Sequence, residues 1–140
     1  MATFVKFQDF AQQLGQGVHQ LQSAGHTLKV YLTNATPNVA THAAKTDLAG
    51  ITEVGGYAPA DIQNDWSEAG GIGTLTGVDV VWTGSAGGFG PFRYVVLYND
   101  TPAAPITDPL IGYWDYTSSI SVGTGETFTV DFGASVLTIQ

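Results

Sequence analysis

The stretch Gly90-Pro91-Phe92-Arg93-Tyr94-Val95-Val96-Leu97-Tyr98-Asn99-Asp100 decides the fold of this chain. From position 92 to position 98, apolar and aromatic residues occupy both alternating sets of positions, with Arg93 as the one charge. A strand that is apolar on both faces is typical of the centre of a sheet. A glycine-rich turn precedes it over residues 83–91, and a loop with three prolines follows over residues 99–109. We therefore expect a central strand at residues 92–98.

Other strand patterns surround this segment at regular intervals. In residues 26–33, Leu28, Val30 and Leu32 alternate with more polar positions, which predicts a half-buried strand. Residues 127–132 alternate in the same way, with Phe128 and Val130 on the apolar face. The remaining predicted strands lie at residues 51–54, 75–82, 110–116, 119–122 and 136–139.

A helical pattern occurs only at the beginning of the chain. Over residues 1–22 apolar residues recur at steps of three and four, the spacing of one helical face; they are Phe4, Phe7, Phe10 or Ala11, Leu14, Val18 and Leu21. Gly15 and Gly17 each cost about 1 kcal/mol relative to alanine, so we expect the second half to be bent or frayed. We expect this helix to dock on its own sheet, with partial contact to a neighbouring subunit.

These patterns predict a mainly β protein, an antiparallel β-sandwich or barrel of about eight strands with one short N-terminal α-helix. The length of 140 residues and the lack of a composition break indicate a single domain over residues 1–140. Within it, residues 1–22 form the helical segment. Residues 23–140 form the β body, with a long loop excursion around residues 55–72.

The charge balance excludes several classes of partner. Twelve acidic residues face four Lys and Arg residues, for a formal net charge of −8. A nucleic-acid binder needs clustered cations, and an anionic membrane attracts them too, so we expect neither partner. Charged residues make up only 11% of the chain, against a typical value of ~25%. A surface of small, uncharged residues loses little side-chain entropy when another protein covers it.

Candidate catalytic and metal-binding residues are few. The chain has no cysteine, and His19, His26 and His42 lack the spacing of a ligand set. Asp61, Asp65 and Glu68 could ligate calcium, but they lack the alternation and central glycine of an EF-hand loop. We expect no cofactor and no bound metal.

Carboxylates could also serve a hydrolase, which needs two of them across a cleft. Asp108, Asp115 and Asp131 are the candidates. A simpler interpretation gives Asp100 and Asp108 to turns and pairs Asp115 or Asp131 with Arg93 across the sheet. The favoured interpretation is therefore that the protein is not an enzyme. A small glycan hydrolase using Asp115 is the alternative from another class.

Aromatic residues supply the candidate contact sites. Tyr57 and Trp66 lie in the long excursion, and loops run over protein surfaces, so we expect this pair to be exposed. Exposed aromatic residues anchor protein interfaces and also stack on sugar rings. Together with Phe4 and Phe7 of the N-terminal segment, they are the predicted interface residues.

Five segments of the chain resemble a family of small virion-associated proteins encoded by tailed bacteriophages. The segments are Phe4-Val5-Lys6-Phe7, Thr27-Leu28-Lys29-Val30-Tyr31-Leu32-Thr33-Asn34, the stretch from Gly90 to Asp100 quoted above, Pro109-Leu110-Ile111-Gly112-Tyr113-Trp114-Asp115-Tyr116 and Gly125-Glu126-Thr127-Phe128-Thr129-Val130-Asp131-Phe132. They cover somewhat over a quarter of the chain, and residues 36–71 depart most from the family.

The resemblance implies a structural component of the virion. With the acidic, cysteine-free composition, it favours a capsid decoration (cement) protein on the outer surface of the head, made in the host cytoplasm. Its expected partners are the major capsid protein and further copies of itself, in a homo-oligomer that is often a trimer in such proteins. The alternative within the virion is a tail or host-attachment component, in which Tyr57 and Trp66 would meet a receptor or glycan.

Overall fold

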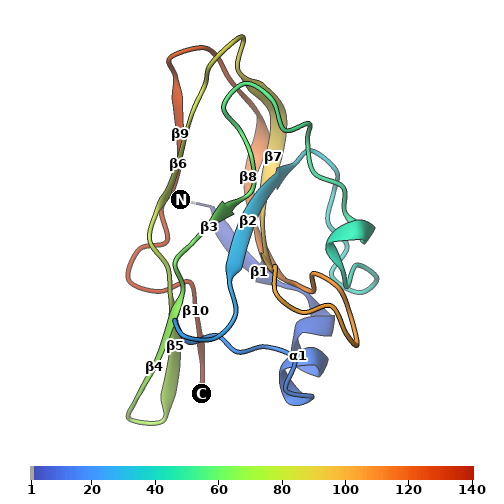
Figure 1. Ribbon diagram of the computed structural model, residues 1–140, viewed down its shortest axis with the longest axis vertical. Coiled ribbons are helices and arrows are strands. Elements are labelled where there is room, and N and C mark those ends of the chain that lie inside the picture. The colour runs from blue at the N-terminus through green and yellow to red at the C-terminus, as the bar shows by residue number, and fades with distance from the viewer. Residues whose placement is uncertain (1) are drawn as a thin grey trace.

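The computed structural model describes residues 2–140 as two packed layers of antiparallel strands with one α-helix at their lower end (Figure 1). One layer is a five-stranded sheet in the order β1 (Thr3–Lys6), β8 (Leu110–Val122), β7 (Phe89–Asn99), β2 (Leu28–Thr33) and β3 (Ala60–Asp61). The other layer holds the sheet β10 (Leu137–Ile139), β5 (Ile72–Thr76) and β4 (Asp65–Ala69), and the pair β6 (Val80–Thr83) and β9 (Thr127–Val130). The expected antiparallel sandwich is confirmed, with ten strands.

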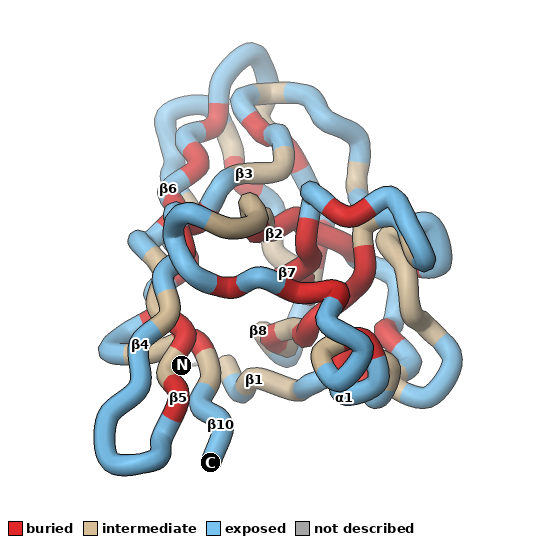
Figure 2. Tube along the Cα trace, turned by 60° about the horizontal axis from the view of Figure 1, so that its bottom comes forward, coloured by how far each residue is buried: buried red, intermediate tan, exposed pale blue. Residues whose placement is uncertain are grey.

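The central strand lies where the sequence predicts it. β7 is hydrogen-bonded to β8 on one side and to β2 on the other, and Val96 is opposite both Tyr113 and Tyr31. Its residues 94–99 are all buried, as Figure 2 shows for the middle of the molecule. Both faces are covered because the second layer lies on one of them, and the N-terminal segment and the loop after β2 lie on the other.

β2 is more buried than its alternating pattern of apolar and polar residues predicts, because both of its faces are covered. Tyr31, expected on the exposed face, is buried, and its hydroxyl donates a hydrogen bond to the Leu48 carbonyl at 2.7 Å. Leu48 follows the short 3-10 helix η1 (Lys45–Asp47), which sits over this face. The expectation of a half-buried strand is wrong because a loop, which has no strand periodicity, supplies the cover.

The N-terminal segment differs most from its prediction. Instead of a helix over residues 1–22, it forms the strand β1, then α1 (Gln8–Gly15), then a loop. β1 pairs with β8 in the register Phe4 to Trp114, because an unpaired sheet edge offers backbone hydrogen bonds that outweigh a weak helical period. The chain leaves the helix at Gly17, whose φ of 76° suits glycine. Val18 beyond it is nevertheless buried.

Several of the predicted strand boundaries also change. The predicted strand at residues 75–82 is two strands, β5 and β6, because residues 72–76 pair with β4 and β10 whereas residues 80–83 pair with β9. Conversely, the strands predicted at 110–116 and 119–122 form one long strand, β8, with irregular register against β7. Residues 51–54 form no strand, and the excursion over residues 55–72 contains β3 and β4.

Aromatic side chains fill the space between the layers. Phe128 of β9 lies with its ring centroid 4.8 Å from Phe92 of β7 and stacks on Trp82 of β6 at 6.3 Å. Lower down, Trp114 of β8 contacts Phe132 at 5.5 Å. In residues 2–140 no helix has the length and apolar character needed to cross a bilayer.

Candidate functional site

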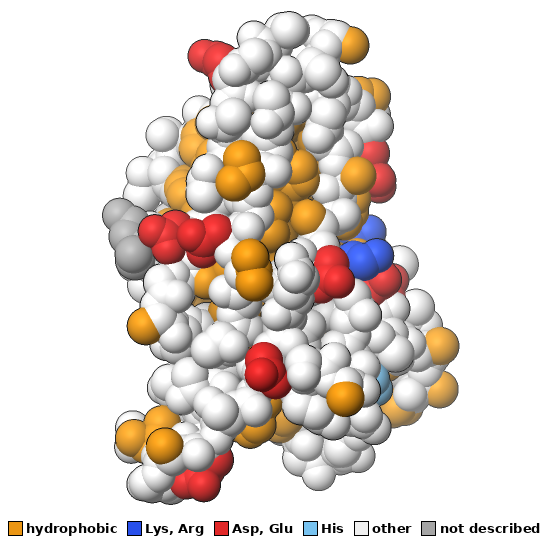
Figure 3. All heavy atoms as spheres, turned by 60° about the vertical axis from the view of Figure 1, so that its left-hand side comes forward, with side chains coloured by type: hydrophobic (Ala, Val, Ile, Leu, Met, Phe, Trp, Pro, Cys, Tyr) orange, Lys and Arg blue, Asp and Glu red, His pale blue; other side chains and the backbone are white. Residues whose placement is uncertain are grey.

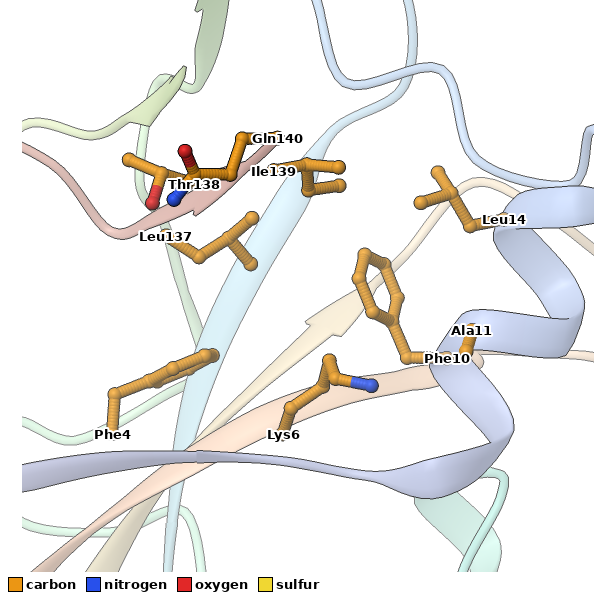
Figure 4. Close-up of a pocket in the computed structure, with 9 residues that line it drawn as sticks. All are labelled: Phe4, Lys6, Phe10, Ala11, Leu14, Leu137, Thr138, Ile139 and Gln140. Carbon is orange, nitrogen blue, oxygen red and sulfur yellow. The ribbon is translucent and has the colours of Figure 1, made fainter. Parts of the chain in front are cut away.

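An open apolar groove lies at the lower end of the sandwich, between α1 and β10 (Figure 4). Its volume is about 640 Å³. Three elements from opposite ends of the chain form it, namely β1, α1 and β10; the lining residues are Phe4, Lys6, Phe10, Ala11, Leu14, Leu137, Thr138, Ile139 and Gln140. The groove thus exists only because the first and last strands, in different sheets, end beside each other.

Phe4 forms the floor at one end of the groove. Its ring lies 4.9 Å from that of Trp114 and rests over Gly112 of β8, where a Cβ atom would overlap it. A glycine in the middle of a strand costs sheet stability, and here its reason is the close approach of this ring. Phe4 remains half-buried, so part of the ring faces the groove.

The wall on the right of Figure 4 is α1. Phe10 and Leu14 stand one helical turn apart on the same face, while Gln8 and Gln12 are exposed to solvent. Phe10 is buried and lies 5.0 Å from the His19 ring, which holds the helix against the loop that follows it. Leu14 is half-buried and faces the groove.

The opposite wall is β10, the last strand. Leu137 and Ile139, two positions apart, share the face that borders the groove, and β5 fixes their register by pairing Ile139 with Gly73. Ile139 is among the exposed large apolar residues of the part of the chain that the structure describes. Both walls therefore present apolar atoms to solvent.

The groove continues into a second hollow of about 340 Å³. Leu14 and Ile139 border both spaces, and the second also contains Trp66, Leu21 and His19. The Trp66 ring lies over Gly73, where a Cβ atom would overlap it. Two aromatic rings, each placed over a strand glycine, thus mark the two ends of one continuous apolar surface.

Lys6 is the one ionisable side chain that borders the larger space. Lys29 pairs with Asp100 at 2.8 Å, Arg93 pairs with Asp115 at 2.8 Å, and Lys45 lies over the Tyr31 ring at 5.2 Å. Within residues 2–140, Lys6 alone among the Lys and Arg residues has neither an ion pair nor a ring contact. It places an uncompensated positive charge beside apolar walls on an acidic protein.

A buried polar network lies behind the second hollow. The amide oxygen of Asn99 accepts a hydrogen bond from the Thr101 N–H, so its amide nitrogen faces two histidines. That nitrogen donates to Nδ1 of His19 at 3.1 Å and to Nδ1 of His26 at 2.9 Å. Accepting at Nδ1 requires the neutral ring. The pKa of His19 is lowered to about 4, chiefly because the ring is buried and secondarily because His26 is nearby.

The four predicted interface residues divide into two pairs. Phe4 and Trp66, 62 positions apart in the sequence, border the two spaces of the same groove. Phe7 and Tyr57 are core residues, at 0% and 4% exposure, so the expectation that they face a partner is wrong.

The burial of this second pair has a clear cause. Phe7 packs against Tyr113 at a ring distance of 5.5 Å on the far side of the large sheet. Tyr57 contacts Trp82 at 5.5 Å, and its hydroxyl accepts a hydrogen bond from the Leu32 N–H at 2.8 Å. The sequence missed the β10 wall because Leu137 and Ile139 look like ordinary strand residues.

The carboxylates have structural partners. Asp115 accepts two hydrogen bonds from Arg93, at 2.8 and 3.0 Å, which confirms the predicted cross-strand pair. Those bonds hold the pKa of Asp115 below its ordinary value, the opposite of what a general acid needs. Asp131 instead accepts from the Gly133 N–H within its own turn.

The calcium candidates behave similarly. Asp61 accepts from the Gln63 N–H, Glu68 from the Gly71 N–H, and Asp65 from the N–H groups of Ser23 and Trp66. Asp61 and Glu68 thus cap local turns, and Asp65 ties the start of β4 to the distant Ser23. Among residues 2–140, no group of three or more His, Asp or Glu side chains is placed to hold a metal ion.

Comparisons of the chain with protein families, with curated proteins and with solved structures give no match.

Proposed function

We propose that this protein is a structural component of a tailed-phage virion, a decoration protein that binds the outer surface of the head and stabilises the junctions between capsomers. The observation that carries the proposal is the open apolar groove at one end of a rigid sandwich. Exposed apolar surface that is gathered in one place is typical of a site where another protein binds. The resemblance of five segments to virion-associated proteins gives the docking its context.

The remainder of the surface supports the same role. Charged residues are sparse, and three of the four Lys and Arg side chains are already occupied within the chain. Repeated contacts of low individual energy add up when symmetry multiplies them, as on a shell. The proposed partners are the major capsid protein and further copies of this chain, in a homo-oligomer such as a trimer. The net charge of −8 argues against nucleic acid and anionic membranes as partners.

The test is a count of copies in purified virions of the phage that encodes the chain. Mass spectrometry against the major capsid protein should give hundreds of copies per particle. Virions that lack the gene should release their DNA at a lower temperature, and adding the purified protein should restore the wild-type value. Absence from the particle would refute the structural role.

The count also separates the head from the tail. Six or twelve copies per particle would contradict the decoration role and support a tail or host-attachment component. For glycan binding in that component, the expected aromatic pair is reduced to Trp66, because Tyr57 is buried. Loss of binding on a glycan array for Trp66→Ala, with Tyr113→Ala as the control for an aromatic residue outside the groove, would support it.

A further inference from the structure

The β4–β5 hairpin projects from the sandwich as its lowest point in Figure 1, and its tip is the loop at the lower left of Figure 2. The two strands are joined by Gly70 and Gly71, with φ of 61° and 86°. A two-residue turn with positive φ at both positions is the tight connection that matches the twist of a hairpin. No other atom lies within 4 Å of the Cβ position of either glycine. The turn therefore projects into open space and does not pack on the rest of the chain.

The tip combines an apolar and an acidic side chain. Ala69 and Ile72 are paired residues and therefore share one face, and Ile72 is 40% exposed. Glu68, paired with Gly73, lies on the other face. Figure 3 shows hydrophobic and acidic side chains together at this lower end of the molecule. The tip is therefore a narrow wedge with an apolar side and one negative charge.

The groove has the complementary properties. Its walls are apolar, and its one ionisable side chain is Lys6, a cation without a partner in the described chain. A wedge with Ile72 and Glu68 matches such a groove in both polarity and charge. Charge complementarity of this kind fixes the register of an interface more than it adds affinity.

A tip cannot enter the groove of its own chain. β10, one wall of the groove, is paired with β5 in the register Leu137 to Leu75, so hairpin and wall belong to the same sheet. In Figure 1 the tip extends below that sheet, away from the groove, which lies between β10 and α1. A second molecule is needed to bring the two surfaces together.

We propose that the groove is the docking site for the β4–β5 hairpin tip of a second copy of this chain, with Ile72 between Leu14 and Ile139 and with Glu68 paired to Lys6. This inference rests on the proposed function, because it names the surface through which the expected homo-oligomer forms. Tip and groove are different surfaces, so the contact is head-to-tail and closes into a ring if the rotation between copies allows it.

The first test is sedimentation velocity of the purified protein over a range of concentrations. The wild type should self-associate, and Ile72→Ser should weaken the association about tenfold through lost apolar burial. Lys6→Glu and Glu68→Lys should each weaken it as well, because each places like charges together. The double variant Lys6→Glu/Glu68→Lys should return to within about threefold of the wild type. Val81→Ser, at a site 57% exposed on β6, is the matched control and should change nothing.

The second test uses the lack of cysteine in the chain. A mixture of Ile72→Cys and Leu14→Cys proteins should form a disulfide-linked heterodimer under mild oxidation, in preference to either homodimer. Substituting Val81→Cys for Ile72→Cys should abolish that preference. Both tests use the isolated protein, so they are independent of the count in virions. A monomer at every concentration, or an oligomer unaffected by these variants, would overturn the inference even where the virion count supports a decoration protein.

Discussion

Lowering the pH from 7 to 5 should destabilise the fold through protonation of the buried residue His19. The residue is 8% exposed, and the Nδ1 atom of its ring accepts a hydrogen bond from Asn99. A protonated ring carries hydrogens on both nitrogens and cannot accept that bond. Burial accordingly lowers the pKa of His19 from 6.5 to about 4 in the folded protein.

The size of the effect follows from that difference. Because the folded pKa is below the unfolded one, the contribution of His19 is fully present above pH 6.5 and is lost as the pH falls toward 4. The whole difference corresponds to about 3 kcal/mol, of which about 2 kcal/mol should be lost between pH 7 and pH 5. The carboxylates with lowered pKa, such as Asp115, lose their contribution only at lower pH, below about 4.

Urea denaturation at pH 7, 6 and 5 measures this slope. The variant His19→Gln keeps a side-chain oxygen that accepts from Asn99 but cannot titrate, so its free energy of unfolding should be nearly constant over the same range. His42→Gln is the control, since the His42 ring accepts only from the Asn38 N–H of its own loop, and this variant should retain the wild-type slope. A wild type that is equally stable at pH 7 and pH 5, or a slope that persists in His19→Gln, would refute the reasoning.

Two further substitutions test the packing. Gly112→Ala should lower the free energy of unfolding by about 1–3 kcal/mol, because the added methyl group displaces the Phe4 ring. Gly15→Ala, at a glycine with open space around its Cβ position, is the control and should be neutral or slightly stabilising in urea denaturation. Tyr57→Phe should cost about 1–3 kcal/mol, because it leaves the buried Leu32 N–H without an acceptor. Thermal denaturation of the Tyr57→Phe variant at a fixed pH measures this loss of stability, and an unchanged midpoint would contradict the assigned hydrogen bond.

The acid effect and the docking surface share one segment. His19 and Leu21 belong to the loop after α1 and also border the second hollow beside Trp66. Loosening of that loop at low pH would therefore alter the groove before the rest of the sandwich unfolds, because the sheets are held by β7 and its neighbours.

The sequence by itself determined the fold class and the centre of the large sheet. Residues 92–98 are apolar on both faces, and only a strand between two others can bury both. Local alternation in residues 127–132 was equally informative, since strand periodicity is a property of neighbouring residues. The pair between Arg93 and Asp115 was also foreseeable, as the only arginine in the chain lies within a strand.

Tertiary structure alone decided the rest. The N-terminal apolar spacing suited a long helix, yet residues 3–6 became a strand because β8 offered them a free edge. Tyr57 was expected at the surface but is buried. A loop that packs onto the core has no regular spacing of apolar residues, so its burial cannot be predicted from the sequence. The groove is formed by residues from the two ends of the sequence. It places Phe4 beside Leu137, and contact between residues so far apart is set by sheet pairing and not by any local pattern.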